Sequence, residues 1–196
     1  MRNNIAILIL AAGSSSRMNA VKQLLPWKGS TFLGHTIQVA KASSANEIFV
    51  VLGAHTDLIK LECKKYAVEY VLNKNWEEGM GTSIACGITH LSRKKENYDG
   101  VLVLVCDQPF INTEYINTVL QASNENVNNI YATKYTHGVG VPALFKSSHF
   151  KELRILSKDF GARQILRREK NNIKKITPNF NTTDIDTKKS YDSLYF

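Results

Sequence analysis

The sequence has few cysteines and no long apolar run, and both absences narrow the class of protein. Its 196 residues include only three cysteines, Cys63, Cys86 and Cys106, which are far apart and follow no metal-binding spacing. An odd and scattered set provides no disulfide framework, so we expect a protein of the reducing cytoplasm. No apolar stretch is long enough to cross a membrane, so we expect no membrane contact. The short apolar run at residues 5–10 leads straight into a Gly/Ser loop, which favours a first strand over a signal-peptide core.

Several familiar binding signatures are also missing. The chain contains neither the G-x-x-x-x-G-K-S/T phosphate loop nor the G-x-G-x-x-G dinucleotide fingerprint. It has no homeodomain, zinc-finger or RNP-like motif, although its net charge is +8. A basic balance suits either nucleic acid or small anionic molecules. Without a nucleic-acid motif, we favour small anionic substrates and expect no nucleic-acid partner.

What the chain does have is a regular alternation of apolar strand patterns and amphipathic helix patterns. Strand patterns cover residues 5–10, 47–53, 68–72, 100–106, 130–133 and 141–145. Helix patterns cover residues 32–43, 56–66, 82–91, 112–120 and 162–168, with a short one near 151 and a last one after 186. The alternation predicts an α/β fold, a three-layer α/β/α sandwich around a mostly parallel sheet. Because we find no repeat and no low-complexity linker, we expect residues 1–196 to form a single domain.

A loop of small residues follows the first predicted strand. After Leu10 come Ala11-Ala12-Gly13-Ser14-Ser15-Ser16, and then two cations, Arg17 and Lys22. Gly and Ser let backbone N–H groups approach a ligand without a Cβ in the way. N–H groups beside an Arg and a Lys suit phosphate oxygens. The alternative interpretation is an ordinary strand-to-helix turn in which Arg17 has no special role.

An aspartate ends the most apolar of the strand patterns. Cys106-Asp107-Gln108-Pro109 follows the run Val101–Val105. A single Asp after a strand is common as a turn former or helix cap and needs no further function. Ligands of open α/β sheets, however, lie beyond the carboxyl ends of the strands. We therefore expect Asp107 and the Gly13 loop at the same edge of one sheet, where a metal–nucleotide complex would need both.

These motifs resemble those of a known family. L-A-A-G-x-S-x-R-M, followed by Lys22 and Leu25-Pro26, resembles the signature loop of the nucleotidyltransferases related to the molybdenum cofactor guanylyl- and cytidylyltransferases. C-D-Q-P resembles the metal-binding Asp motif of that family. The resemblance extends from Leu10 to Asp186 and implies the Rossmann-like nucleotidyltransferase fold. It also implies a reaction in which a phosphate oxygen of an acceptor attacks the α-phosphorus of an NTP and pyrophosphate leaves.

The resemblance implies roles for particular residues. Arg17, Lys22 and Asp107 would be catalytic, and Asp107 and Asp186 would hold Mg²⁺, which prefers carboxylate and phosphate oxygens. The NTP would contact a larger set: Leu10, Ala11, Ala12, Gly13, Ser14, Arg17, Lys22, Asn73, Gly79, Ser83 and Asp107. Three of these belong to the segment N-x-x-W-x-x-G-M-x-x-S, which includes Trp76. By itself that segment is equally well explained by a Gly before a helix and a Trp in the core.

The chain departs from the family pattern in three places. Asp184-Ile185-Asp186-Thr187 lacks the P-E-D that usually follows, and a helix N-cap at Asp186 or Thr187 is an alternative explanation. Lys158 replaces the first Gly of G-D-x-G-A-R, where Gly161 and Arg163 remain suited to a phosphate. The segment 137–142 lacks the usual basic residue before its proline. Residues 151–175 carry nine Lys or Arg against three Asp or Glu, which indicates either a solvated face or a rim that attracts an anionic acceptor.

Substrate identity follows from the branch of the family that the motifs resemble. L-A-A-G and C-D-Q-P look closer to the cytidylyltransferases than to the guanylyl branch, which more often has L-A-G-G. We therefore expect CTP as the nucleotide and molybdopterin as the phosphate acceptor. The alternatives are a nucleotidyltransferase for another phosphorylated metabolite and a non-catalytic carrier that delivers molybdenum cofactor to a hydroxylase. The resemblance includes transient contact with such a molybdenum hydroxylase as an expected partnership.

Overall fold

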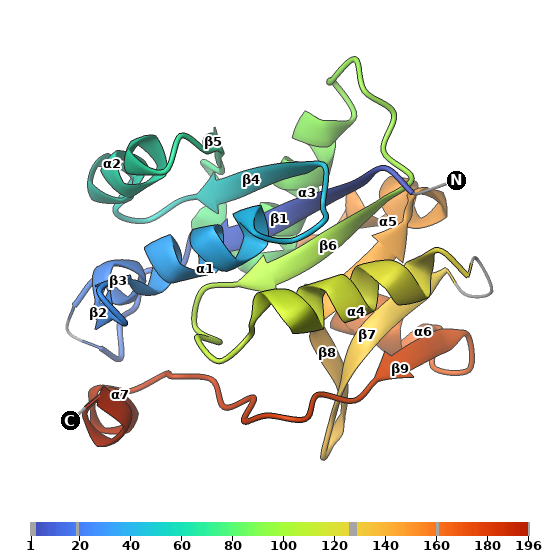
Figure 1. The fold of residues 1–196 in the computed structure, drawn as a ribbon. Coiled ribbons are helices and arrows are strands. Elements are labelled where there is room, and N and C mark those ends of the chain that lie inside the picture. The colour runs from blue at the N-terminus through green and yellow to red at the C-terminus, as the bar shows by residue number, and fades with distance from the viewer. Residues whose placement is uncertain (1–2, 19, 126–128, 160, 196) are drawn as a thin grey trace.

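A seven-stranded sheet forms the centre of the molecule, in a computed structural model that describes residues 3–18, 20–125, 129–159 and 161–195 (Figure 1). The strands lie in the order β5-β4-β1-β6-β8-β7-β9. Their bounds are Ile5–Ala11 (β1), Glu47–Leu52 (β4), Glu69–Leu72 (β5), Gly100–Val105 (β6), Ile130–Tyr135 (β7), Gly138–Lys146 (β8) and Ile173–Ile176 (β9). Only β8 runs against its neighbours, because β6 and β7 both pair with it in antiparallel fashion. The predicted mostly parallel sheet is confirmed.

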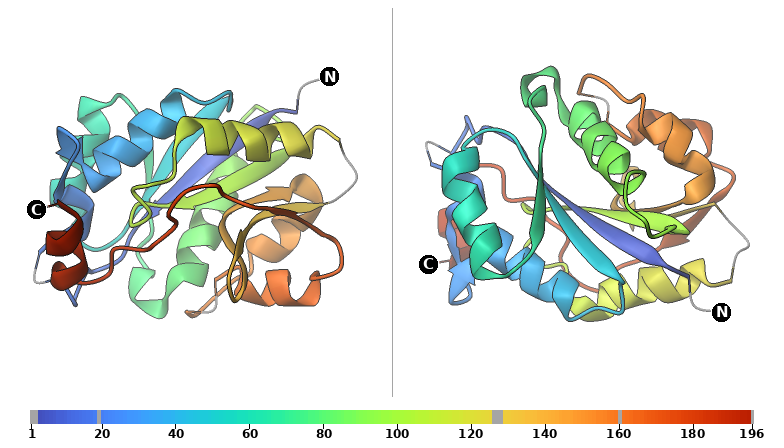
Figure 2. Two further views of the ribbon diagram at one scale, coloured as in Figure 1. Left: turned by 60° about the horizontal axis from the view of Figure 1, so that its bottom comes forward. Right: turned by 90° about the horizontal axis from the view of Figure 1, so that it is seen from above.

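Helices cover both faces of this sheet, as the three-layer prediction requires (Figures 1 and 2). One face carries α1 (Phe32–Lys41), α2 (Thr56–Lys65) and α4 (Thr113–Ser123). The other carries α3 (Met80–Leu91), α5 (Phe150–Leu153) and α6 (Arg163–Arg168). A last helix, α7 (Lys188–Tyr195), lies beside a small hairpin made of β2 (Pro26–Trp27) and β3 (Ser30–Thr31). Three 3-10 turns complete the fold, at Lys22–Leu24, Trp76–Glu78 and Ser147–His149.

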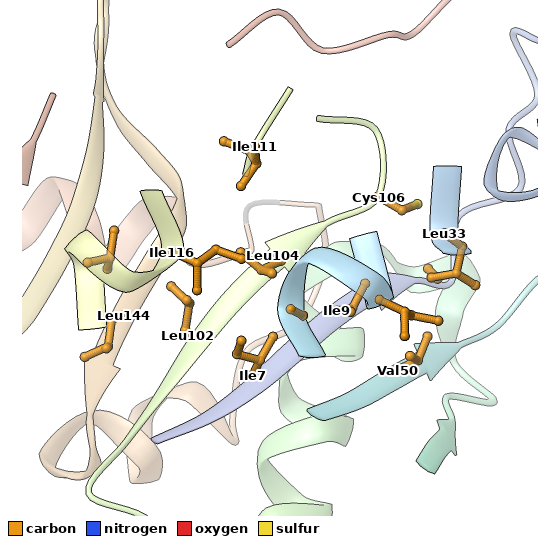
Figure 3. Close-up of a cluster of buried hydrophobic side chains, with 14 of the residues drawn as sticks. Ile7, Ile9, Leu33, Val50, Leu102, Leu104, Cys106, Ile111, Ile116 and Leu144 are labelled. Atoms are coloured by element: carbon orange, nitrogen blue, oxygen red, sulfur yellow. The ribbon is translucent and has the colours of Figure 1, made fainter. Parts of the chain in front are cut away.

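Strand β1 shows why the first apolar run of the sequence is continuous. Ile5, Ile7 and Ile9 pack into the core under α1 and α4, part of which is drawn in Figure 3. The residues between them, including Leu8 and Leu10, pack into the core on the other face. A central parallel strand is buried on both sides, so neither set of side chains meets water. β1 therefore fixes the position of the loop that follows it.

The sequence patterns do not predict one strand of the central sheet, β9, or the separate two-stranded hairpin β2–β3. β9 has the sequence I-K-K-I, in which only Ile173 and Ile176 are buried, so its apolar signal is too short to recognise. It forms by pairing in parallel with β7, about forty residues earlier in the chain. The hairpin β2–β3 is two residues long on each side and was also not predicted. None of the helices in the described ranges has the length and apolar character needed to cross a membrane.

A third, aromatic cluster fastens the C-terminal segment to the hairpin. The rings of Trp27 and Tyr191 lie on either side of Phe32, with centroid distances of 5.4 and 5.7 Å. The Tyr191 hydroxyl donates a hydrogen bond of 2.9 Å to the Pro26 carbonyl. Ile185, fully buried, belongs to the same cluster. The segment after β9 therefore runs back across the molecule and is held next to the carboxyl ends of the central strands (Figure 2).

We predict that replacing Tyr191 loosens this segment. Tyr191→Ala removes a buried aromatic ring and should lower the free energy of unfolding by roughly 3 kcal/mol. Backbone hydrogen exchange of residues 184–191 should rise at the same time. Tyr191→Phe keeps the ring, loses only one hydrogen bond, and should cost about 1 kcal/mol. Unchanged exchange in Tyr191→Ala would show that the cluster does not hold the segment.

Candidate functional site

The carboxyl ends of neighbouring strands bring the two main sequence motifs together. β1 and β6 pair in parallel, with Leu10 opposite Val105. The Gly13 loop leaves β1 and Asp107 follows β6, so both begin at the same edge of the sheet. β4 ends at this edge on the other side of β1, with Leu52 opposite Ala11. The structure thus places the loop and the aspartate side by side, at the position where α/β sheets bind ligands.

The centre of the site is an ammonium group between two carboxylates. Lys22 Nζ lies 2.9 Å from an oxygen of Asp107 and 3.0 Å from an oxygen of Asp186. The Lys22 side chain is only 13% exposed and that of Asp107 is 25% exposed. An Arg17 nitrogen lies 3.9 Å from the same oxygen of Asp186, and its side chain is 73% exposed. Four charged residues from three distant parts of the sequence therefore converge here.

Electrostatics keep Lys22 and Asp186 ionised. Burial by itself would lower the pKa of Lys22, but the charges and hydrogen bonds of Asp107 and Asp186 raise it above its ordinary value. Burial by itself would raise the pKa of Asp186, but the bond and charge of Lys22, with a contribution from Arg17, lower it. Lysine is therefore cationic and Asp186 anionic at neutral pH.

Hydrogen bonds carry the C-terminal segment onto the end of β6. The backbone N–H of Ile185 donates to the Asp107 carbonyl at 2.9 Å. Gln108 donates through Nε2 to Asp184 at 2.9 Å and to the Tyr135 hydroxyl at 2.8 Å. Burial, followed by the nearby charges of Asp107 and Asp186, raises the pKa of Asp184. Asp184 therefore helps to fasten the segment, while Asp186 is the residue that reaches Lys22.

The loop after β1 has its carbonyl groups tied back on both sides. Gln23 donates through Nε2 to the carbonyls of Ala11 and Gly13, at 3.1 and 2.8 Å. The carbonyl of Ala12 accepts from the backbone of Ala54 at 3.0 Å. The carbonyl of Ser14 lies 3.2 Å from Nε2 of His55, which donates when the ring carries its proton on that nitrogen. The four consecutive carbonyl groups of residues 11–14 therefore each have a hydrogen-bond donor.

The N–H groups of the same loop are left free to bind a ligand. In a planar trans peptide the N–H points away from the carbonyl, so fixing the carbonyls also directs the N–H groups. Within the described part of the chain, no N–H of residues 13–16 donates to a protein group. Ser15 has a φ of +56°, a conformation that gathers successive N–H groups into an anion-binding concavity. A Cβ added to Gly13 would meet nothing within 4 Å, so the space beside the loop is open.

Sequence reasoning missed Gln23 and His55. Gln23 is 2% exposed. A single polar residue after Lys22 does not indicate in the sequence that the Gln23 side chain is buried. His55 follows the end of β4 and has a φ of +55°, unusual for a residue with a side chain. The rule that ligands lie beyond strand ends, applied to β4 as well as to β1 and β6, would have pointed to it.

The segment 73–83, predicted to contact the NTP, makes contacts within the protein. Asn73 is buried and donates through Nδ2 to Thr82 at 2.9 Å and to Ser83 at 3.0 Å, which joins the end of β5 to the start of α3. Gly79 has a φ of +111° and lies against the loop at 158–159. Trp76 packs on Gly53, where a Cβ would come within 2.5 Å of the Trp76 Cβ. The contacts to nucleotide proposed for Asn73, Gly79 and Ser83 stay predictions.

The segment 158–163, which was expected to suit a phosphate, lies next to the same end of α3. The Lys158 carbonyl accepts from Gly81 at 2.9 Å. Lys158 has a φ of +60°, so it adopts the left-handed conformation for which the family pattern has a glycine. Gly161 also has a positive φ, of 50°, and Arg163 begins α6. Phe160, the middle residue of this motif, lies outside the described residues.

The two carboxylates of the cluster suit a divalent cation that keeps other ligands. Both reach a single cationic nitrogen at about 3 Å, so both can contact one ion between them. Among the described residues, no group of three or more His, Cys, Asp or Glu side chains is placed to hold a metal. Mg²⁺ commonly takes one or two carboxylates together with waters and substrate phosphates. The residues present therefore fit a metal that arrives with a phosphate ligand.

Comparisons with known proteins identify the family of the chain. A family model described as a MobA-like NTP transferase domain matches residues 7–173. The purine catabolism protein PucB of Bacillus subtilis is 27% identical over 201 residues, which cover 95% of this chain and 94% of PucB. A probable molybdenum cofactor guanylyltransferase of Bacillus mycoides is 31% identical over 121 residues, which cover 60% of this chain and 56% of that protein.

Solved structures agree on the fold. Rv0371c of Mycobacterium tuberculosis superposes with a TM-score of 0.84 at 24% identity, covering 99% of this chain and 98% of that one. A structure of Rv0371c in complex with manganese gives a TM-score of 0.79 at 23% identity, with 97% of each chain covered. The Rossmann-like nucleotidyltransferase fold implied by the sequence motifs is thereby confirmed. With the family model spanning most of its length, the chain belongs to the MobA-like NTP transferase family.

Proposed function

We propose that this nucleotidyltransferase transfers CMP from CTP to molybdopterin, with release of pyrophosphate. The observation that carries the proposal is the Lys22–Asp107–Asp186 cluster beside a loop with free N–H groups. The cluster can neutralise charge that develops on the reacting phosphate, and the N–H groups of the loop can bind phosphate oxygens. The relative from Bacillus mycoides, named as a molybdenum cofactor guanylyltransferase, supports a molybdopterin-type acceptor.

The chain's own groups account for most of the work in this reaction. The N–H groups of residues 13–16 bind triphosphate oxygens, and Gln23 and His55 keep those groups in position. Arg17, exposed at the rim of the site, donates to the transferring phosphate and the leaving pyrophosphate. Asp107 and Asp186 would hold a divalent cation such as Mg²⁺, which supplies further charge neutralisation at the phosphate oxygens. Alignment of the two anionic substrates then lowers the barrier.

The same site favours an enzyme over a non-catalytic carrier of molybdenum cofactor. A carrier needs neither Asp107 nor Asp186, yet both are present and converge on one cation. The proposal includes a cytoplasmic location and transient contact with a molybdenum hydroxylase.

The decisive experiment measures pyrophosphate release from each of the four NTPs, with Mg²⁺ and with or without molybdopterin. Release that is fastest with CTP, and that occurs only when molybdopterin is present, is the expected result. Release that requires a different acceptor would favour another phosphorylated metabolite.

Asp107→Asn should remove turnover and leave the fold intact. The substitution keeps the size of the side chain but removes a negative charge that holds the metal and Lys22. We expect kcat to fall by roughly a hundredfold or more, since metal charge at the transition state contributes several kcal/mol. Asp192→Asn, on exposed α7, makes the same chemical change away from the cluster and should keep full activity. An active Asp107→Asn enzyme, or one that unfolds, would contradict the assigned role.

Gln23→Leu should weaken nucleotide binding. The apolar side chain cannot donate to the carbonyls of Ala11 and Gly13, so the loop loses the bonds that direct its N–H groups. The KM for the NTP should rise about tenfold or more, and unfolding should become easier by about 1–3 kcal/mol because buried carbonyls lose their donor. Gln38→Leu, on the exposed side of α1, serves as the matched control. If the KM of Gln23→Leu stays at the wild-type value, the tied carbonyls do not matter for binding.

Base choice should depend on Ala12. Ala12 is 6% exposed and directly follows β1, and its methyl group lies close to Gly53, which follows β4. We expect its methyl group to narrow the space beside the base, so that a pyrimidine fits better than a purine. One methyl group contributes about 1–3 kcal/mol of discrimination, so Ala12→Gly should reduce the CTP preference without abolishing it. The measurement is the ratio of kcat/KM for CTP and GTP, and a wild type that prefers GTP would overturn the argument.

A further inference from the structure

Lys22 occupies the place between two carboxylates that a metal ion would need. Its Nζ atom is within hydrogen-bond distance of Asp107 and Asp186 at once, and its side chain is largely buried. Arg17, at 3.9 Å from Asp186, is a more distant cation. The remaining carboxylate nearby, Asp184, bonds to Gln108 instead. The protein itself thus supplies a positive charge between the two carboxylates.

Electrostatic repulsion opposes the binding of an ammonium group and a metal ion to the same two carboxylate oxygens. Mg²⁺ binds carboxylate oxygens at about 2.1 Å. An ion touching the same oxygens of Asp107 and Asp186 that now contact Lys22 would therefore lie within about 4 Å of Nζ. Charges of +2 and +1 at that distance repel each other appreciably even when partly exposed to water. Either the ammonium group stays or the metal binds.

The Lys22 ammonium group can also reach a second position, beside the loop after β1. Its backbone N–H donates to the Ser15 hydroxyl at 3.1 Å, so the base of its side chain is fixed to the phosphate-binding loop. A long flexible stem lets the ammonium group turn from the carboxylates toward an anion held by the free N–H groups of that loop. A bound triphosphate would offer it negative oxygens in exchange for those it leaves.

We propose that Lys22 and the metal ion occupy the Asp107–Asp186 pair alternately, so that the metal binds together with the nucleotide and not before it. The inference rests on the proposed function, because it assigns the loop to phosphate and the pair to metal. Its consequence concerns the nucleotide-free protein, which should bind a divalent cation weakly although both ligands are present. Removing the ammonium group should then open the site to the metal.

The test is a titration of nucleotide-free protein with Mn²⁺, followed by the paramagnetic signal of the free ion. Lys22→Met should bind Mn²⁺ at least about tenfold more tightly than wild type, because one nearby positive charge is gone. Lys22→Gln is a second neutral variant that can still donate to either carboxylate, and it should show the same gain. Lys22→Arg keeps the charge and should bind as weakly as wild type. Lys174→Met, which changes a lysine on β9 near Glu125, should have no effect.

A double variant shows which ligands the ion uses. Lys22→Met combined with Asp186→Asn should return Mn²⁺ affinity to the weak wild-type value. Tight Mn²⁺ binding by nucleotide-free wild type, or equal affinities in wild type and in both neutral variants, would overturn the inference. The titration contains no nucleotide and no acceptor, so its result is independent of whether CTP and molybdopterin are the substrates. Failure of pyrophosphate release with CTP would overturn the proposed substrates and leave the alternation of Lys22 and metal standing.

Discussion

Compensation of charge between Lys22, Asp107 and Asp186 is the interaction on which the candidate site depends. Two carboxylates this close repel each other unless a cation lies between them, and Lys22 meets both within 3.0 Å. Lys22 and Asp186 are 164 positions apart in the chain. The β2–β3 hairpin, the aromatic cluster around Phe32 and the backbone bond from Ile185 to Asp107 all serve to hold these distant segments together.

The order of the central strands makes the rest of the site possible. β4, β1 and β6 are parallel neighbours, so their carboxyl ends lie in a row. The end of β4 supplies Ala54 and His55, which bind loop carbonyls, and the end of β6 supplies Asp107. Small residues in the loop leave its backbone N–H groups accessible, because no Cβ beyond those of Ala and Ser stands in the way. Each contribution is ordinary for its position, and the function comes from their being adjacent.

The sequence predicts those parts of the fold and of the candidate site that have a local sequence pattern. The buried run Ile5–Leu10, the Gly13 loop and Asp107 each have a local signal, and the strand-end rule places the last two together. Gln23 could not be found in this way, because its inward turn depends on carbonyls that the folded loop presents to it. β9, which precedes Asp186 in the chain, could not be found either, because its I-K-K-I sequence gives no strand signal. Its pairing with β7 starts the return of the chain to the site.

The reversed direction of β8 has a consequence for how such a protein can diversify. Because β7 runs parallel to β6 and β8 runs back, the turn that joins β7 to β8 projects from the same edge as Asp107. Tyr135, at the end of β7, contacts Gln108 through its hydroxyl group, so this turn borders the cluster without forming part of the loop after β1. Loops accept insertions and substitutions more readily than the strands that carry them. The β7–β8 turn can therefore change in length and sequence next to the cluster while β1, β6 and the loop after β1 stay as they are.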